Sequence, residues 1–329
     1  MAEITLTGTA TSPKLILPVQ IVLGIPLGSQ SMAVGSKAVI EVEGRQLTLT
    51  NLEKVLYPDA AFTKAAVIDY YARIAPVMLG HLGGRAVTMV RFPNGVDGGS
   101  FFEKRCPPHA PDWVRRAPMD GLVACVVDDA PTLVWMANLA ALELHTLQAR
   151  VDDPEHPTSM VFDLDPGAPA GVLTCCQVAL DLRSALEGLG LVSVIKTSGS
   201  KGLHLAVPVR GATADDTKSF ARGLGQLLAK QEPDRVTVVM NKDARPNRVF
   251  VDWSQNDRHK TTVCAYSLRA ERHPTVSTPL TWDEVSDALD HHDPQALTFE
   301  APAVLQRVEE RGDVFAANLT VDQALPVLR

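Results

Sequence analysis

The second half of the chain alternates short apolar runs with longer amphipathic segments, the pattern of strands and helices within one layered unit. Runs rich in β-branched and aromatic residues predict strands, whereas apolar residues three and four apart predict helices. Strands are expected at residues 160–164, 192–197, 203–207, 235–240 and 249–253, and helices at residues 173–189 and 214–230. This order predicts an α+β fold, in which helices pack on one face of a mixed sheet.

The first half has a different order of predicted elements, with one amphipathic helix followed by several strands. Thr63 suits the N-cap of a helix that ends near residue 79, with Gly80 as its stop signal. Strands are expected at residues 87–92, 101–103 and 122–127, a buried helix or helix–strand join at residues 132–144, and a linker at residues 152–157. Residues 1–45 predict a β-rich or partly irregular extension, and short helices are expected from Trp282 onward.

The composition is that of a globular protein, because 46% of the 329 residues are apolar and 21% are charged. Residues 15–27 form the longest apolar stretch, which is too short to span a membrane, and no secretory signal is visible, so we expect a cytoplasmic protein. The net charge of −7 argues against a general polyanion binder. Residues 235–272 nevertheless contain eight basic and four acidic side chains, which predicts a local anion-binding face.

The cysteines are five in number and include no Cys-x-x-Cys pair, so they indicate neither a zinc site nor a redox disulfide. We therefore expect buried thiols in a reducing compartment. The residues concerned are Cys106, Cys125, Cys175, Cys176 and Cys264.

Two aspartates, Asp163 and Asp165, end the strand predicted at residues 160–164. Side chains alternate along a strand, so these carboxylates project together while Phe162 and Leu164 pack on the other side. Close carboxylates repel, and a divalent cation relieves that repulsion. Pro166 then ends the strand, which predicts a carboxylate pair at a sheet edge within reach of a substrate. The alternative is that the segment is only a polar strand exit.

A loop rich in glycine and serine, Lys196-Thr-Ser-Gly-Ser-Lys-Gly-Leu-His204, joins the next two strands. Its backbone N–H groups, the Ser198 and Ser200 hydroxyls and Lys201 predict an anion site, and His204 could donate to a phosphate. The spacing is not that of a Walker A loop. An ordinary turn remains the alternative.

A third aspartate, Asp252, lies in the strand predicted at residues 249–253, where an unpaired charge is costly. It requires either a metal ion or an arginine, for which Arg245 and Arg248 are the candidates. Three carboxylates with an anion-binding loop could hold two divalent ions that align a 3′-hydroxyl with an α-phosphate. A metal-dependent phosphohydrolase could use the same residues with water as the attacking group.

These motifs resemble those of archaeo-eukaryotic primase-polymerases, most closely the polymerase domain of bacterial ligase D and its stand-alone actinobacterial homologues. The resemblance rests on Asp163-Leu-Asp165, Ser198-Gly-Ser-Lys-Gly-Leu-His204, Val249-Phe-Val-Asp252-Trp-Ser-Gln-Asn256, Lys54-Val-Leu-Tyr-Pro58, Pro93-Asn-Gly-Val96 and Phe101-Phe-Glu-Lys104. It implies an RRM-like catalytic module at residues 158–281, packed on an α/β lobe at residues 46–157 that binds nucleic acid. Helices at residues 282–329 complete the domain, and residues 1–45 precede it.

The same resemblance implies a role for each matching residue. Asp163, Asp165 and Asp252 would hold Mn²⁺ or Mg²⁺. The residues expected to contact the incoming nucleotide are Ser198, Lys201, His204, Gln255, Lys260 and Arg269 on its phosphates, with His145, Phe101 and Phe102 approaching it from the neighbouring lobe. The residues expected to contact DNA are Lys54 and Lys64 on a 5′-phosphate and Arg245 on the template. Without the resemblance, the two lysines are solvated surface charges and at least one of the two phenylalanines is core.

The activity implied is template-dependent addition of a few nucleotides, preferably ribonucleotides, at short gaps or broken DNA ends in repair. The expected partners are gapped or broken DNA with a 5′-phosphate, nucleoside triphosphates, a separate DNA ligase and Ku, with a location at the nucleoid. Val90 stands where these domains carry a basic residue, the segment between Trp113 and Trp135 is shorter, and no Lys-x-Asp-Gly ligase motif is present. A DNA-break-binding alignment factor and a metal phosphohydrolase are the alternatives.

Overall fold

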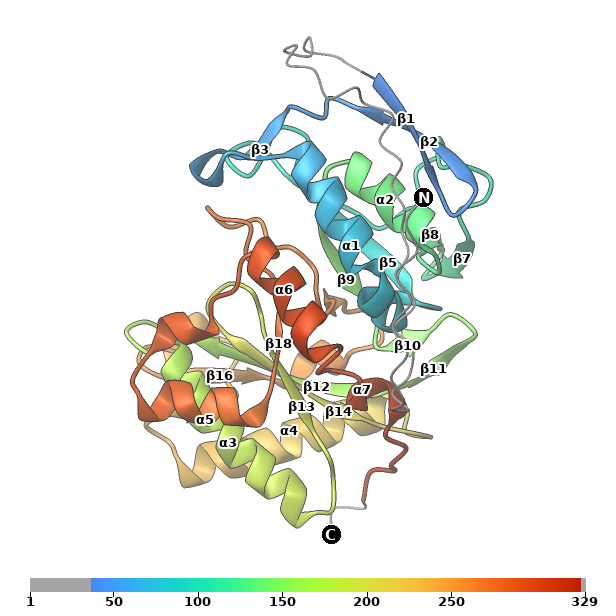
Figure 1. Ribbon diagram of the computed structural model, residues 1–329. Helices are drawn as coiled ribbons and strands as arrows, with labels where there is room; N and C mark the ends of the chain where they lie inside the picture. Colours follow the sequence, from blue (N-terminus) through green and yellow to red (C-terminus); the bar gives the residue numbers. More distant parts are fainter. Residues whose placement is uncertain (1–36, 327–329) are drawn as a thin grey trace, which may run out of the picture.

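The structure, a computed structural model, describes residues 37–326, which form two lobes with separate apolar cores (Figure 1). The first lobe is built on a sheet of order β17-β9-β5-β8-β7, in which β6 also pairs with β5. Its elements are β1 (Lys37–Val42), β2 (Arg45–Thr50), β3 (Val55–Tyr57), η1 (Pro58–Ala60), β4 (Phe62–Thr63), α1 (Lys64–Leu82), β5 (Ala86–Arg91), β6 (Phe101–Glu103), β7 (Arg116–Met119), β8 (Leu122–Val126), α2 (Ala130–Asn138), β9 (Ala141–Thr146), β10 (Ala149–Arg150), β11 (Asp153–Pro157) and β17 (Thr262–Val263).

The second lobe is built on a sheet of order β15-β16-β12-β14-β13-β18, in which only β15 and β16 run parallel. The remaining elements are β12 (Ser159–Pro166), α3 (Val172–Gly188), β13 (Val194–Thr197), β14 (Leu203–Pro208), α4 (Ala214–Gln231), β15 (Val236–Thr237), η2 (Lys242–Ala244), β16 (Val249–Asp252), η3 (Trp253–Asn256), β18 (Pro279–Leu280), α5 (Trp282–Asp290), η4 (Pro294–Leu297), α6 (Ala301–Arg311) and α7 (Ala317–Thr320). Figure 1 shows α3 and α4 beneath this sheet and the first lobe above it. The predicted α+β class is confirmed.

The two faces of β12 belong to different cores. Phe162 and Leu164 are fully buried in the core that also contains residues of α3 and α4, whereas Val161 is buried in the core of the first lobe. Because side chains alternate along a strand, Asp163 and Asp165 lie on the same face as Val161. The carboxylates therefore face the first lobe, as the alternation predicted.

The prediction that helix α1 ends at Gly80 is wrong. The helix begins with Thr63, whose hydroxyl accepts from the Ala66 N–H, and continues to Leu82 before Gly83 caps it. A Cβ on Gly80 would lie 2.9 Å from the Leu319 side chain of α7, so this glycine permits α7 to pack closely against α1. A glycine that allows close approach and one that stops a helix look the same in a sequence.

Two smaller differences separate the sequence prediction from the structure. The strand expected at residues 235–240 is only Val236–Thr237, because the chain leaves the sheet there and exposes about half of Val239 and Met240. The expected linker at residues 152–157 forms β11, which pairs with β10. A strand in the N-terminal extension is confirmed for β1, and the strands expected before residue 37 lie outside the described residues.

The side chain of Asn256 completes the edge of β12 where its neighbour strand stops. Strand β16 pairs with β12 only from Asp163 to Pro166, which leaves Val161 without a strand partner on that side. Asn256 Oδ1 accepts from the Val161 N–H at 2.8 Å, and its Nδ2 donates to the Val161 carbonyl at 2.7 Å. Since Asn256 is buried, these two backbone groups depend on it for hydrogen bonding.

Replacing Asn256 with alanine should destabilise the protein by roughly 2–4 kcal/mol, because a buried donor and a buried acceptor lose their partner. Urea unfolding followed by circular dichroism measures this change. Asn241→Ala is the matched control, since Asn241 is exposed and its side chain accepts from the Asp243 N–H. Equal effects of the two substitutions would show that Asn256 does not support β12.

Candidate active site

Three aspartates meet on the face of the second sheet that is turned toward the first lobe. In the antiparallel pair β12–β16, Asp163 lies directly opposite Asp252, and Asp165 follows two residues along β12. The Gln255 amide Nε2 lies 3.3 Å from Asp163 Oδ2 and 3.4 Å from Asp252 Oδ2, so both carboxylates point toward the same amide. Strand β12 is an interior strand, so the predicted position at a sheet edge is wrong, and the site lies on the sheet face.

The three carboxylates do not share the same electrostatic environment. Burial and the charge of Asp163 raise the pKa of Asp165 to about 6, with a smaller contribution from Asp252. Burial also raises the pKa of Asp163, but interaction with His204, whose Nε2 lies 3.2 Å from Asp163 Oδ1, reverses this and the net shift is downward. Repulsion is thus concentrated on Asp165, the carboxylate that would gain most from a nearby cation.

The imidazole of His204 is held between the carboxylates and a buried lysine. Lys196 Nζ lies 3.1 Å from His204 Nδ1 and donates to Ser277 Oγ at 2.6 Å. Because an ammonium group can only donate, Nδ1 accepts and the proton of a neutral His204 lies on Nε2, facing Asp163. Burial lowers the pKa of Lys196 to about 7.

A cleft with a volume of about 250 Å³ opens beside the carboxylates. Its lining brings together residues from β9, β12, the loop between β13 and β14, and the segment that leads into β17. The sequence-predicted residues among them are His145, Asp163, Asp165, Ser198, Lys201, His204, Gln255 and Arg269. The structure therefore gathers into one cleft residues that lie far apart in the sequence.

The loop between β13 and β14 is held closed by its own first serine. Ser198 Oγ accepts from the N–H groups of Ser200 and Gly202 at 3.2 and 3.1 Å, so these two N–H groups are not free for an anion, contrary to expectation. Gly199 has a φ of +73°, and a Cβ there would lie 2.6 Å from the Arg269 side chain. The cationic donor that the loop offers the cleft is Lys201, which is exposed.

Two predicted basic residues lie at the margin of the carboxylates. Arg245 Nη1 lies 3.9 Å from Asp165 Oδ2, and its guanidinium stacks 3.8 Å from the centroid of Phe250. Lys260 Nζ donates to Ser254 Oγ at 2.5 Å, and the same hydroxyl hydrogen bonds Asp252 Oδ1. The hydrogen bonds of Asp252 are therefore to Ser254 and Gln255. Arg245, a candidate partner of Asp252, lies near Asp165 instead.

The first lobe carries a second hollow, with a volume of about 240 Å³, lined by Lys54, Lys64 and Arg91. Lys64 is buried and donates to the Thr50 carbonyl at 2.6 Å, so it is not a solvated surface charge. Burial, together with the charges of Lys54 and Arg91, lowers the pKa of Lys64 to about 8. Three cations that repel one another in a hollow form a site suited to a multiply charged anion.

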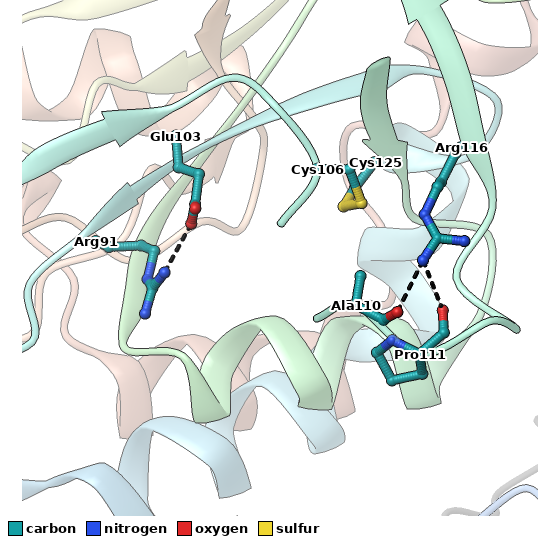
Figure 2. Close-up of a disulfide and its surroundings, with 7 residues drawn as sticks. All are labelled: Arg91, Glu103, Cys106, Ala110, Pro111, Arg116 and Cys125. Carbon is teal, nitrogen blue, oxygen red and sulfur yellow. Dashed lines mark hydrogen bonds and ion pairs between the residues drawn. A yellow bond between two sulfur atoms is a disulfide. The ribbon is translucent and has the colours of Figure 1, made fainter. Parts of the chain in front are cut away.

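Strand β6 connects this cationic hollow to the cleft. Arg91 donates from Nη1 to Glu103 Oε2 at 2.8 Å, as Figure 2 shows, and its guanidinium lies 5.2 Å from the Phe101 ring. The ring of Phe102 lies 6.4 Å from that of His145. Phe101 is 44% and Phe102 is 66% exposed, so neither is core and both rings are accessible for stacking.

One cysteine prediction is wrong. Cys106 and Cys125 form a disulfide, because the chain after β6 lies against β8 and brings their Cα atoms within 4.8 Å (Figure 2). The Cys106 N–H also donates to the Val123 carbonyl at 2.7 Å, so backbone pairing places the two residues side by side. The other cysteines, Cys175, Cys176 and Cys264, are buried thiols as predicted.

Several polar residues around the two hollows carry no distinct signal in the sequence. Arg91 directly follows Val90, and Asn94, which accepts from Lys54 Nζ at 3.0 Å, lies within the Pro93-Asn-Gly-Val96 motif without an expected role. Glu143 was not singled out, although it precedes His145 by two residues on a predicted buried segment, where a charge needs a partner. Lys196 was treated as part of the loop.

The two-lobed fold, the carboxylate face and the facing cationic hollow define a protein of the primase-polymerase class. Residues 63–315 match the family model described as LigD, primase-polymerase domain. The chain is 42% identical over 283 residues to the multifunctional non-homologous end joining protein LigD of Mycolicibacterium smegmatis, covering 82% of this chain and 36% of that protein. It is 31% identical over 276 residues to the bifunctional LigD of Bacillus subtilis, covering 82% of this chain and 44% of that protein. The chain thus belongs to the LigD primase-polymerase domain family.

A solved structure supports the same assignment. The polymerase domain from Mycobacterium tuberculosis ligase D in complex with DNA matches with a TM-score of 0.76 and 42% identity, covering 82% of this chain and 96% of that one. The chain spans about a third of the length of the mycobacterial relatives that it matches. The resemblance inferred from the motifs is therefore confirmed.

Asp165→Asn should stabilise the protein in EDTA at pH 7.5, because the folded-state pKa of Asp165 is raised from 3.8 to about 6. A raised pKa means that folding favours the protonated carboxyl, so stability is lost as pH rises between about 4 and 6. The gain should be at most about 1 kcal/mol, since the side chain is 42% exposed and solvent screens the repulsion. Thermal unfolding at pH 4 and 7.5 measures it.

Asp163→Asn is the matched control, because the pKa of Asp163 is shifted downward and its ionised form is the favoured one. This substitution should lower the midpoint of unfolding at pH 7.5. Stabilisation by both substitutions, or by neither, would contradict the assignment of the repulsion to Asp165.

Proposed function

We propose that this protein is a template-dependent polymerase that adds a few nucleotides, preferably ribonucleotides, to 3′ ends at short gaps or broken DNA ends. The observation that carries the proposal is the register of β12 on β16, which gathers Asp163, Asp165 and Asp252 beside a cleft lined by Lys201 and Arg269. Carboxylates for cations next to basic residues for phosphates are the groups that nucleotidyl transfer requires. The curated relatives are named as non-homologous end joining proteins, which agrees with this role.

The carboxylates fit divalent cations, and we propose Mn²⁺ or Mg²⁺ held by Asp163, Asp165 and Asp252. Burial and the charge of Asp163 raise the pKa of Asp165, a cost that a bound cation would reduce, and carboxylate oxygens are the donors that these ions prefer. Within residues 37–326 no group of three acidic, histidine or cysteine side chains is arranged to hold a metal ion, so binding would require the three carboxylates to reorient toward it. Bound cations would polarise the α-phosphate and neutralise the leaving pyrophosphate.

The remaining cleft residues would bind and orient the nucleoside triphosphate. Lys201 and Arg269 would neutralise its phosphate oxygens, with Ser198 and Gln255 supplying neutral donors. His204 is positioned by Lys196 to direct Nε2–H toward Asp163 and the phosphates. Lys260 reaches the same region through Ser254.

Of the two exposed rings of β6, Phe102 lies next to a lining residue of the cleft and Phe101 lies next to Arg91 of the cationic hollow. Phe102 lies beside His145, so a base or sugar entering there would meet an aromatic face and an imidazole. Stacking on Phe101 or Phe102 accepts any base, which suits a polymerase that follows a template. Arg245, which lies near Asp165 and stacks on Phe250, would contact the template strand.

The hollow formed by Lys54, Lys64 and Arg91 would bind the 5′-phosphate on the far side of a gap. The mutual repulsion of its cations favours a ligand with more than one negative charge, such as a terminal phosphate. Strands β7 and β8 are joined by the short turn Asp120-Gly121, so no long loop projects there to hold a second DNA end. We therefore propose that filling gaps in one duplex is favoured over bridging two ends.

The proposed partners follow from this chemistry. Filling a gap leaves a nick that a separate DNA ligase would seal, and Ku is the proposed partner at broken ends. No helix among residues 37–326 is long and apolar enough to cross a membrane. A location with the chromosomal DNA in the cytoplasm is part of the proposal.

Asp165→Ala should lower primer extension by at least roughly a hundredfold while DNA binding is retained, because this carboxylate serves the cations and the lysines serve the DNA. A primer-extension assay on gapped DNA with Mn²⁺ and UTP or dTTP measures the extension rate. Fluorescence anisotropy measures DNA binding. Asp287→Ala, an exposed change on α5, is the control.

The same assay separates the alternatives. Shortening of the primer would indicate a phosphohydrolase. Full retention of repair by the Asp165→Ala variant would indicate a DNA-break-binding factor whose role does not depend on catalysis.

Lys54→Ala should reduce the preference for a gap that carries a downstream 5′-phosphate over one with a 5′-hydroxyl by roughly threefold to tenfold. The ratio of the two dissociation constants measures this preference at fixed salt. Lys230→Ala on α4 removes an exposed charge on the opposite side of the second lobe and should leave the ratio unchanged. An unchanged ratio for Lys54→Ala would remove the hollow from the proposed function.

A further inference from the structure

Glu143 is a buried carboxylate at the boundary between the two lobes. It lies on β9, two residues before His145, and is 9% exposed. A buried charge is costly unless it is paired and hydrogen bonded, so its partners indicate its role. It does not line the cleft itself.

The two oxygens of Glu143 serve different nucleotide-site residues. Oε2 lies 2.8 Å from His145 Nε2, whereas Oε1 accepts from Arg269 Nε at 3.0 Å and from the Ala270 N–H at 3.1 Å. Burial raises the pKa of Glu143, but His145 and Arg269 outweigh it and lower the pKa to about 2. The carboxylate is therefore ionised at neutral pH and accepts from both sides.

Arg269 carries this connection into the second lobe. Its Nη1 donates to the Ser198 carbonyl at 2.7 Å, so one guanidinium joins Glu143 to the loop between β13 and β14. Its own carbonyl accepts from the Tyr57 hydroxyl at 2.9 Å, which fixes the backbone at the same point. Two ends of the guanidinium are thereby occupied, and its orientation is determined by contacts on both lobes.

We propose that Glu143 is a positioning residue for the incoming nucleotide, which it orients through His145 and Arg269 without touching it. This inference rests on the proposed polymerase function and extends it to a residue of the supporting layer. A side chain that is held before the substrate arrives loses less conformational freedom on binding, which improves affinity. One carboxylate that holds two lining residues of the cleft also fixes their separation.

Glu143→Gln tests the proposal, because glutamine keeps the shape but removes the charge and offers one oxygen in place of two. The KM for UTP in gap filling should rise roughly tenfold, the loss expected for a charge-assisted hydrogen bond, while the dissociation constant for gapped DNA changes less than twofold. Glu143→Asp, which keeps the charge on a shorter side chain, should recover part of the affinity.

Glu284→Gln is the matched control. Glu284 is also paired with an arginine, Arg307, but this pair links α5 to α6, and neither residue lines the cleft. It should lower the midpoint of thermal unfolding without changing the KM for UTP. If Glu143→Gln behaves in the same way, Glu143 is only structural and the proposal fails.

A double-mutant cycle identifies the route of action. In an Arg269→Ala background, Glu143→Gln should raise the KM for UTP by clearly less than tenfold, since one of the two residues through which it acts is absent and only His145 remains. A further tenfold rise would show that Glu143 does not act through Arg269 and would overturn the proposal. If wild-type protein extends no primer, the polymerase function itself fails and the inference with it, whereas active wild type with an unaffected Glu143→Gln variant overturns the inference alone.

Discussion

The second lobe holds three mutually repelling carboxylates close together, and its sheet must stabilise this arrangement. The register of β12 on β16 places Asp163 opposite Asp252 and leaves Asp165 close to both, although each charge disfavours the others. The opposite face of β12 compensates for this, because Phe162 and Leu164 are fully buried under the helices. Hydrophobic packing on one side of a single strand thus maintains an electrostatically unfavourable arrangement on the other.

Local periodicity carried most of the information that the sequence could supply. The alternation around Asp163 and Asp165 predicted which side chains share a face, and the amphipathic segments predicted α3 and α4 to within a residue or two. The position of Asp252 opposite Asp163 could not follow from periodicity, because register between strands far apart in the chain depends on the whole sheet. The sequence grouped the three aspartates by their residue type and by the resemblance to a family, and neither gives the register.

The failures have a common physical origin. Gly80, the pair Cys106 and Cys125, and the burial of Lys64 all depend on which distant segment packs against the residue. That distant segment cannot be identified from the neighbouring residues in the sequence. Each residue was therefore predicted to behave as its residue type usually does. The same applies to Glu143 in the site, because its partner Arg269 lies 126 residues later in the sequence.

The path of the chain has a consequence for how this protein can be divided or recombined. Strand β17 follows β12 to β16 of the second lobe's sheet in sequence, returns to the first lobe and pairs with β9 beside His145, and the chain then adds β18 to the second lobe's sheet. The polypeptide therefore crosses between lobes more than once, and neither lobe is encoded by one uninterrupted stretch. Exchange of genetic modules between homologues would preserve the fold only if the crossover points lie outside residues 141–263, so this region should be inherited as a block.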